Sequence, residues 1–436
     1  MRIAVVGLGK LGSPLLAVAA NAGHQVVGTD LNPLFVDAIR DGKAPVAEPG
    51  LAELLSNRAE FISATMNTAE AIASAELIFV VVPTPSLADG WFSWELVVEA
   101  ILQIGFEVGG DYPVVALVST VCPGQCQKYV IPNLERASHR KCGRDLGFCY
   151  NPTFIALGSV IHDLTHPDLV LVGHSDERAA DVVETFHRSI CKNDPSILRM
   201  SIINAEISKL ALNTYVTTKI SYAAMLARFC EQLPGADAAV VCEAIGHDRR
   251  IGYHCLRPGT AYGGPCLPRD NRALVAAGKR AGVEMFLAAE TDGINFSQDW
   301  RMASWVLEHR KPGERVGILG LAYKAGTPVC ECSAGIDLVH GLLQFTSIVV
   351  WDELALPTVE ITLGAVVEYA ESLASCCRRA DVIVVMLPDP AFARLPPPEV
   401  SGKVILDAWT VVENAAEFHP DTRYIRLGVG PQEDTR

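Results

Sequence analysis

The sequence has few charged residues, few aromatic residues and no apolar run of membrane-spanning length. Charged residues make up 20% and aromatic residues 7% of the 436 residues, whereas hydrophobic residues make up 50%. This balance is typical of a compact globular chain and argues against disorder. Apolar runs such as residues 3–6 and 77–82 have the length of strands. We therefore expect no membrane span, no signal segment and a cytoplasmic protein.

Positive charge and metal-binding spacings are also scarce. Asp and Glu number 50 against 36 Lys and Arg, a net charge of -14. This excess disfavours binding to nucleic acid, and an anionic ligand needs a locally positive pocket. The 13 cysteines include no Cys-x-x-Cys pair of the kind that holds zinc. We expect no metal site, and most cysteines other than Cys266 should be small buried residues in a reducing compartment.

Three segments differ in their hydrophobic patterns. Residues 1–200 alternate strand-length apolar runs with helical stretches, which predicts a doubly wound parallel sheet. Residues 201–310 are helical, with one helix of about seven turns starting near residue 204. Such a long helix often buries its apolar face on a second subunit, so we expect a dimer. In residues 311–436 the alternation returns. The predicted fold is α/β, with two doubly wound Rossmann-like domains joined by a helical domain.

A glycine-rich loop follows the first predicted strand. The pattern Gly-x-Gly-x-x-Gly opens a helix, and the next strand ends at Asp30. Glycines allow close approach of a pyrophosphate, and Asp30 can accept hydrogen bonds from a ribose diol. A carboxylate there favours NAD over NADP, and the alternative is a purely structural turn. The loop residues of this predicted cofactor site are Gly7, Leu8, Gly9, Lys10, Leu11 and Gly12.

Two later segments carry candidate functional side chains. Lys209 and Asn213 are four residues apart and project from one face of the long helix, although a solvated helix face is the alternative. Cys266 follows a Gly-Gly pair and precedes Asp270 by four residues. A thiol beside a carboxylate, in a chain with a dinucleotide site, suggests an oxidation through a covalent intermediate.

These motifs occur in an order that resembles the UDP-glucose/GDP-mannose (nucleotide-sugar) 6-dehydrogenase family over nearly the whole chain. The most specific match is Gly-Gly-x-Cys-x-Pro-x-Asp at residues 263–270. The other matching segments are residues 7–12, Thr84, residues 119–124, residues 151–154, Lys209 with Asn213, residues 250–252 and residues 320–324.

The resemblance implies a four-electron oxidation of a hexose C6 alcohol by two NAD molecules. Cys266 would form a thiohemiacetal and then a thioester. Lys209 and Asn213 would stabilise the oxyanion, and Asp270 and Thr120 would position water. A UDP-glucose-type substrate would give UDP-glucuronate for polysaccharide biosynthesis.

The resemblance also implies the binding sites and the partners of the chain. Thr84 and Thr120 would join the glycine loop in binding NAD. Arg250 would reach the substrate site of the partner in a homodimer. The implied substrate-binding residues are Thr153, Phe154, Lys209, Asn213, Arg250, Tyr262, Gly263 and Lys324.

Several positions depart from the family pattern. Thr153 and Leu157 stand where two glutamates are usual, and the first of these glutamates assists thioester hydrolysis. Glu331 replaces an arginine, and Trp409 stands where an arginine is common. Gln125 and Arg269 replace a threonine and a lysine.

These departures leave two alternatives open. One is a homologue with slow thioester hydrolysis, and the other is a catalytically silent paralogue that binds a nucleotide sugar. A hydroxyacid dehydrogenase shares the dinucleotide-helical plan but needs no cysteine nucleophile, so the motif around Cys266 argues against it.

Overall fold

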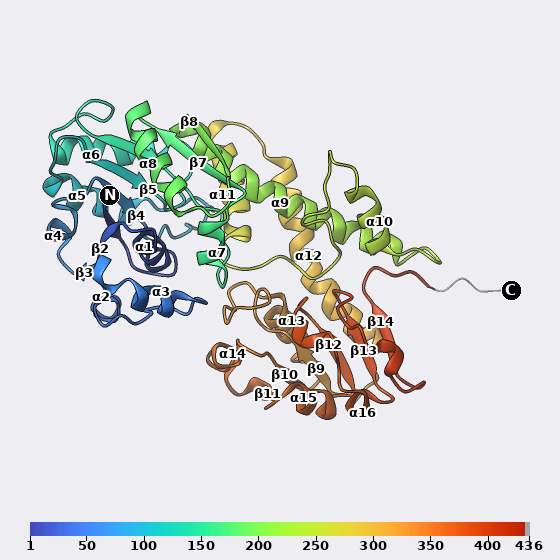
Figure 1. Cartoon of the computed structure of the whole chain (residues 1–436). Coiled ribbons are helices and arrows are strands. Elements are labelled where there is room, and N and C mark those ends of the chain that lie inside the picture. Colours follow the sequence, from blue (N-terminus) through green and yellow to red (C-terminus); the bar gives the residue numbers. More distant parts are fainter. Residues whose placement is uncertain (432–436) are drawn as a thin grey trace. The chain divides into compact units, whose positions relative to one another are not determined.

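The computed structural model describes residues 1–431, which form two compact units, one spanning Met1–Ala211 and the other beginning at Leu212. The first unit is built on an eight-stranded sheet in the order β3-β2-β1-β4-β5-β6-β7-β8 (Figure 1). All neighbouring strands are parallel except β6 and β7. The strands are β1 (Arg2–Val6), β2 (Gln25–Thr29), β3 (Ile62–Thr65), β4 (Leu77–Val80), β5 (Val114–Leu117), β6 (Gly147–Tyr150), β7 (Leu169–His174) and β8 (Ser196–Ser201).

Helices cover both faces of this sheet. Side chains of β1 alternate between two hydrophobic clusters: Ile3 and Val5 lie in one, and Ala4 and Val6 lie in the other. A strand that is apolar on both faces is typical of a doubly wound sheet. The helices are α1 (Gly12–Asn21), α2 (Pro33–Arg40), α3 (Leu51–Asn57), α4 (Thr68–Ile72), α5 (Glu95–Glu107), α6 (Ile131–Ser138), α7 (Val160–Thr165) and α8 (Glu177–Ile190).

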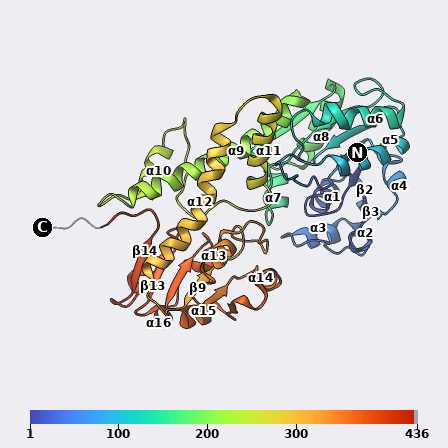
Figure 2. The same ribbon diagram turned by 180° about the vertical axis from the view of Figure 1, so that it is seen from behind.

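One long helix, α9 (Ile202–Cys230), starts in the first unit and continues into the second. It is followed by α10 (Ala238–Gly246), α11 (Leu267–Ala281) and α12 (Phe286–His309), as Figure 2 also shows. No glycine or proline interrupts α9, so its backbone hydrogen bonds continue over its whole length. No helix among residues 1–431 is both long and apolar enough to span a membrane.

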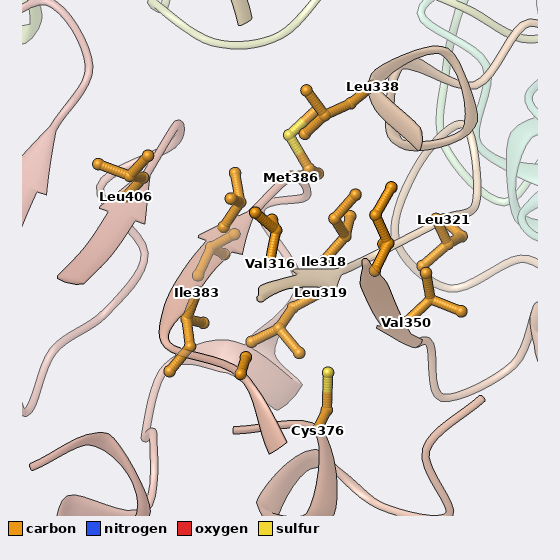
Figure 3. Packing of buried hydrophobic residues seen from close by; sticks show 14 of the residues in the cluster. Val316, Ile318, Leu319, Leu321, Leu338, Val350, Cys376, Ile383, Met386 and Leu406 are labelled. Atoms are coloured by element: carbon orange, nitrogen blue, oxygen red, sulfur yellow. The ribbon is translucent and has the colours of Figure 1, made fainter. Parts of the chain in front are cut away.

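A second, smaller sheet completes the second unit. Its six strands are all parallel, in the order β11-β10-β9-β12-β13-β14. Figure 3 shows side chains of its central strands packed between Leu338 on one side and Cys376 on the other. The strands are β9 (Val316–Leu319), β10 (Ile348–Trp351), β11 (Glu368–Tyr369), β12 (Val382–Val385), β13 (Val404–Asp407) and β14 (Arg423–Arg426), and the helices are α13 (Ala334–Leu342), α14 (Leu356–Leu363), α15 (Leu373–Arg379) and α16 (Pro397–Val400).

The predicted fold class is confirmed, with two doubly wound sheets and a helical segment that contains a long helix. The apolar pattern of the sequence does not mark β3 and β8 of the first sheet as strands. The apolar residues of β3 are interrupted by Ser63, and β8 is largely exposed, so neither strand has the continuous apolar run of the central strands.

Candidate active site

The glycine loop connects β1 to α1 and has the geometry that a dinucleotide requires. Gly7 has a φ of +99°, and a Cβ added there would lie 2.1 Å from the Val81 carbonyl oxygen. A Cβ on Gly12 would lie 1.8 Å from the Gly7 carbonyl oxygen, whereas a Cβ on Gly9 would meet nothing within 4 Å. The first and third glycines are therefore required by the packing of the protein itself. The second leaves open room where a pyrophosphate would approach.

Asp30, at the end of β2, is held against this loop. Its carboxylate accepts hydrogen bonds from the backbone N–H groups of Leu8 at 2.6 Å and Asn32 at 2.8 Å, one on each oxygen. A carboxylate oxygen has more than one lone pair, so Asp30 can still accept hydrogen bonds from a ribose diol. Lys10 is exposed in the same loop. The loop and Asp30 together fit NAD.

The segments after β4 and β5 meet at the same edge of the sheet. The Ser119 hydroxyl accepts a hydrogen bond from Val82 N at 2.9 Å and donates one to Val82 O at 2.7 Å. Thr84 is buried and Thr120 is half-buried next to these contacts. Because β4 and β5 are parallel neighbours, their carboxyl ends bring both threonines to the edge where doubly wound sheets bind ligands.

Gln125, which replaces a usual threonine, has a structural role. Its side chain is buried, with Oε1 accepting from Cys122 N at 2.7 Å and Nε2 donating to Phe92 O at 2.7 Å. These bonds fix the turn that carries Thr120.

Glu206 is a buried carboxylate that the sequence patterns did not reveal. It is fully buried on α9 and accepts hydrogen bonds from Gly124 N at 2.6 Å and Cys126 N at 2.8 Å. Burial raises the pKa of Glu206, and the two N–H donors oppose this effect. Glu206 therefore ties the turn after β5 to the helix that carries Lys209, three residues further on.

Lys209 is buried, with only 5% of its surface exposed, so the alternative of a solvated helix face is wrong. Its Nζ lies 4.6 Å from the centroid of the Phe154 ring, a cation–π contact. Phe154 belongs to the loop after β6, which begins at the buried Asn151. The Asn151 amide donates to Leu171 O at 2.8 Å, and its Oδ1 pairs with His187 Nε2 at 2.8 Å. This anchored loop thus contributes to the surroundings of Lys209.

The positions of the two missing glutamates differ in character. Thr153 is partly exposed near the start of the loop. Leu157 packs against the core cluster of the first sheet, and the next residue, Gly158, donates its N–H to Glu48 Oε2 at 3.0 Å. An apolar contact has therefore taken the place of a carboxylate at residue 157.

In the second unit, Asn213 and Asp270 form a buried pair. Asn213 Nδ2 donates to Asp270 Oδ2 at 2.6 Å, and the two residues are 8% and 2% exposed. Arg269, which replaces a usual lysine, lies with its Nε 3.9 Å from Asp270 Oδ1. The predicted pair of Lys209 and Asn213 thus has both members buried on α9, with Asn213 held by a carboxylate.

Cys266 is half-buried at the N-cap of α11, and Asp270 lies in the first turn of the same helix. The backbone N–H of Asp270 donates to Cys266 O at 2.9 Å, which closes that first turn. The positive end of a helix dipole stabilises negative charge on a thiol sulfur. Cys266 therefore lies at the N-terminus of α11, one helical turn from the Asp270–Asn213 pair.

The segment before Cys266 is fixed by its own contacts. Tyr262 is buried, and its backbone N–H donates to Asn295 Oδ1 at 2.8 Å while Asn295 Nδ2 donates to Tyr262 O at 3.0 Å. Burial, and then the nearby Asp292, raise the pKa of the Tyr262 phenol above its ordinary value, so the hydroxyl remains a neutral donor.

Gly263 and Gly264 leave no open room over their Cα atoms. A Cβ on Gly263 would lie 1.9 Å from Cys332 O, and one on Gly264 would lie 2.4 Å from the Tyr323 ring. The absence of a side chain at these glycines thus allows a loop of the protein itself to pack on them. If Gly263 binds a sugar, as predicted, it would have to use its backbone. Lys324, next to Tyr323, is half-buried in this loop.

The remaining predicted residues lie on the surface or in loops. The Arg250 side chain is 85% exposed and pairs with Asp248 at 2.6 Å, in a turn after the end of α10. Arg250 thus lies beyond the last turn of α10, which ends at Gly246. Glu331 is exposed, and the Trp409 ring lies over Gly259, whose added Cβ would approach it within 2.6 Å.

The cysteines follow the expectation in part. Seven of the 13 cysteines are buried, and Cys255 and Cys332 are exposed. No cluster of His, Cys, Asp and Glu side chains suited to a metal ion occurs among residues 1–431.

Comparisons with known proteins identify the family. Domain profiles of the UDP-glucose/GDP-mannose dehydrogenase family match residues 1–191 (NAD binding domain), residues 203–297 (central domain) and residues 317–414 (UDP binding domain). The chain is 33% identical to UDP-glucose 6-dehydrogenase AglM of Haloferax volcanii over 402 residues, which are 91% of this chain and 93% of that protein. It is 30% identical to GDP-mannose 6-dehydrogenase of Pseudomonas aeruginosa over 79% of both chains.

A solved structure agrees with this assignment. A UDP-glucose dehydrogenase from the archaeon Pyrobaculum islandicum superposes with a TM-score of 0.88 at 29% identity, covering 97% of this chain and 96% of that one. The family profile identifies NAD as the cofactor, and the glycine loop has room for its pyrophosphate. The chain belongs to the UDP-glucose/GDP-mannose dehydrogenase family, an NAD-dependent family whose members oxidise nucleotide sugars.

Proposed function

We propose that this chain oxidises the C6 alcohol of a UDP-glucose-type nucleotide sugar to the uronic acid, with Cys266 as the nucleophile. The observation that carries the proposal is the place of Cys266 at the N-terminus of α11, one turn from the buried Asp270–Asn213 pair. The relatives named above act on nucleotide sugars, which supports the substrate class. In this proposal residues 1–200 bind NAD, residues 201–310 form the dimer and carry the nucleophile, and residues 311–436 bind the nucleotide sugar.

Bound NAD would supply a hydride acceptor for each of two oxidations. Lys209 stabilises the alkoxide that develops at C6 in the first oxidation, and Asn213 supplies a second donor through its other amide hydrogen. The Cys266 sulfur then adds to the aldehyde carbon and forms a thiohemiacetal, which becomes a thioester when it loses a second hydride to the cofactor and its hydroxyl proton to solvent. Water cleaves the C–S bond, releasing a carboxylate and the free thiol. Asp270 and Thr120 position this water.

The last step, hydrolysis of the thioester, lacks the glutamate that is usual at residue 153. Thr153 cannot act as a base near neutral pH as a glutamate does, and Leu157 faces the hydrophobic core. If hydrolysis is slow, a sugar adduct of Cys266 accumulates, and intact-protein mass spectrometry detects it during turnover. Two NADH per uronic acid without any adduct would show that another group has taken over the role of the missing base.

A second candidate function is a silent paralogue that binds a nucleotide sugar without oxidising it. The loss of the glutamates and the charge reversal at Glu331 favour it. Cys266→Ala separates the two readings, because an enzyme loses product formation while a binding protein keeps both its ligand affinity and its biological effect.

We also propose a homodimer that forms along α9, in a protein of the cytoplasm. Four large apolar side chains on this helix, Tyr215, Tyr222, Met225 and Phe229, are between 45% and 63% exposed and fall on one face. Lys219 of the same helix donates to Ile251 O and Gly252 O and so holds the turn that carries Arg250. A contiguous apolar stripe of this kind is typical of a subunit interface. Sedimentation equilibrium of Tyr222→Glu should show monomers, and monomeric wild type would contradict the proposal.

The experiment that tests the function is incubation with a panel of UDP- and GDP-linked hexoses while NADH is followed and products are identified. A uronic acid from a UDP-glucose-type sugar is expected. No turnover of any hexose, under conditions where NAD binds, would refute the proposed function.

A further inference from the structure

The loop of residues 320–333, between β9 and α13, is packed directly on the Gly-Gly pair that precedes Cys266. Gly264 donates its backbone N–H to Glu331 O at 2.9 Å. The Cys332 carbonyl oxygen and the Tyr323 ring fill the space over the two glycines, where an added Cβ would meet them at 1.9 and 2.4 Å. Three contacts thus join two residues of the turn to one loop.

This loop is itself fixed by a buried carboxylate. Asp352 Oδ2 accepts hydrogen bonds from Leu321 N at 2.7 Å and Ala322 N at 3.0 Å. Its Oδ1 accepts hydrogen bonds from two further backbone N–H groups after β10. The Ser333 hydroxyl donates to Leu321 O at 2.7 Å, and Tyr323 N donates to Val329 O at 2.9 Å. The residues on both sides of Tyr323 are therefore held, and its ring has a defined place.

The turn on which the loop is packed has little freedom to absorb a shift. Gly264 has a φ of +82°, and only Pro265 separates it from Cys266. The proline ring fixes its own φ, so movement of Gly264 is passed on to the N-cap of α11. Cys332 adopts a φ of +49°, which a residue with a Cβ takes only where its surroundings require it. The Cys332 carbonyl is thus held toward Gly263 against a conformational preference.

We propose that Tyr323 is a positioning residue for Cys266, acting through Gly264, and this inference rests on the proposed function. The ring holds the turn so that the sulfur meets the aldehyde carbon before the aldehyde leaves. Glu331 takes part in this packing through its backbone carbonyl, which accepts the Gly264 N–H. The first hydride transfer needs no thiol, so a displaced Cys266 slows the second oxidation selectively.

The test compares Tyr323→Ala with Tyr323→Phe, which keeps the ring, and with Tyr369→Ala, which removes a tyrosine ring elsewhere in the same sheet domain. In Tyr323→Ala we expect free aldehyde, with one NADH formed for each aldehyde released, so that NADH per sugar falls from two toward one. The kcat for oxidation of added aldehyde should drop roughly tenfold or more, since a displacement of about 1 Å can cost on the order of 100-fold. Tyr323→Phe, which keeps the ring over Gly264, should lie closer to wild type than Tyr323→Ala in both measurements. Tyr369→Ala should stay within about twofold of wild type.

A second readout does not depend on turnover. The rate at which iodoacetamide alkylates Cys266, followed by peptide mass spectrometry, should rise at least about threefold in Tyr323→Ala, because the turn opens more often. Alkylation of the exposed Cys255 serves as the internal reference and should be unchanged. If Tyr323→Ala does not fold, Tyr323→Leu keeps apolar bulk and should show the same changes at smaller size.

These measurements separate failure of the inference from failure of the proposed function. Unchanged Cys266 alkylation and an unchanged NADH yield in a folded Tyr323→Ala or Tyr323→Leu variant would overturn the positioning role. Absence of turnover in wild type would refute the proposed function, and the alkylation comparison would then decide on the positioning role alone.

Discussion

Acidification should destabilise the first unit through His187. This residue is buried on α8, and burial lowers its pKa from 6.5 to about 4. Its Nε2 is within hydrogen-bond distance of Asn151 Oδ1, while Nδ1 is buried without a hydrogen-bond partner among residues 1–431. A proton added to Nδ1 would therefore place an unpaired charge in the core.

The sign and size of the effect follow from linkage. Below pH 6.5 the unfolded chain takes up a proton at His187 that the folded chain does not bind until about pH 4. The contribution of neutral His187 to the free energy of unfolding is thus fully present above pH 6.5 and is lost as the pH falls from 6.5 to 4. At about 1.4 kcal/mol for each pH unit between these values, the loss is on the order of 3 kcal/mol.

The assay is hydrogen exchange of β6 and α8 amides at pH values from 7 to 4, in wild type and in His187→Gln. Glutamine keeps a donor for Asn151 Oδ1 but does not titrate. Because Asn151 begins the loop that carries Phe154, the acid-induced opening should extend to residues 151–158. A difference in opening free energy between the two proteins that stays constant within about 0.5 kcal/mol from pH 7 to 4 would refute the reasoning.

Three further changes test other parts of the account. Gly9→Ala should fold like wild type but bind NAD at least about tenfold more weakly in titration calorimetry, since its Cβ enters the open room for the pyrophosphate. Gly7→Ala should show a lower midpoint of thermal unfolding, because its Cβ collides with backbone. Glu206→Gln should lower the free energy of unfolding by about 1.5–3 kcal/mol, because an amide offers one acceptor oxygen to two buried N–H groups. The control is Glu60→Gln at an exposed position, and equal denaturant midpoints for the two variants would contradict this prediction. Phe154→Leu should lower kcat by about threefold to tenfold through loss of about 1 kcal/mol of cation–π contact, with little effect on NAD affinity.

Sequence patterns predicted the local structure around the candidate site where a local rule determines it. Asp30 lies at the end of a strand beside a glycine loop, and its contact with Leu8 follows from that topology. Lys209 and Asn213 share one face of a helix because of their spacing, but only the fold shows that both are buried.

The remaining features depend on contacts between segments distant in sequence. Glu206 accepts a hydrogen bond from the backbone N–H of Cys126, which is 80 residues away in the sequence, and no periodic pattern marks it. The resemblance implies that Gly263 binds the substrate, but it does not show what lies over the two glycines before Cys266. The space over them is occupied by a loop further along the chain, at Tyr323 and Cys332.

The most direct test of the central claim is the amount of NADH and uronic acid formed from a UDP-glucose-type sugar by wild type and by Cys266→Ala. The account predicts two NADH per uronic acid for wild type, and no uronic acid from Cys266→Ala even though that variant still binds NAD. Uronic acid formed by Cys266→Ala at the wild-type rate would contradict the role of Cys266.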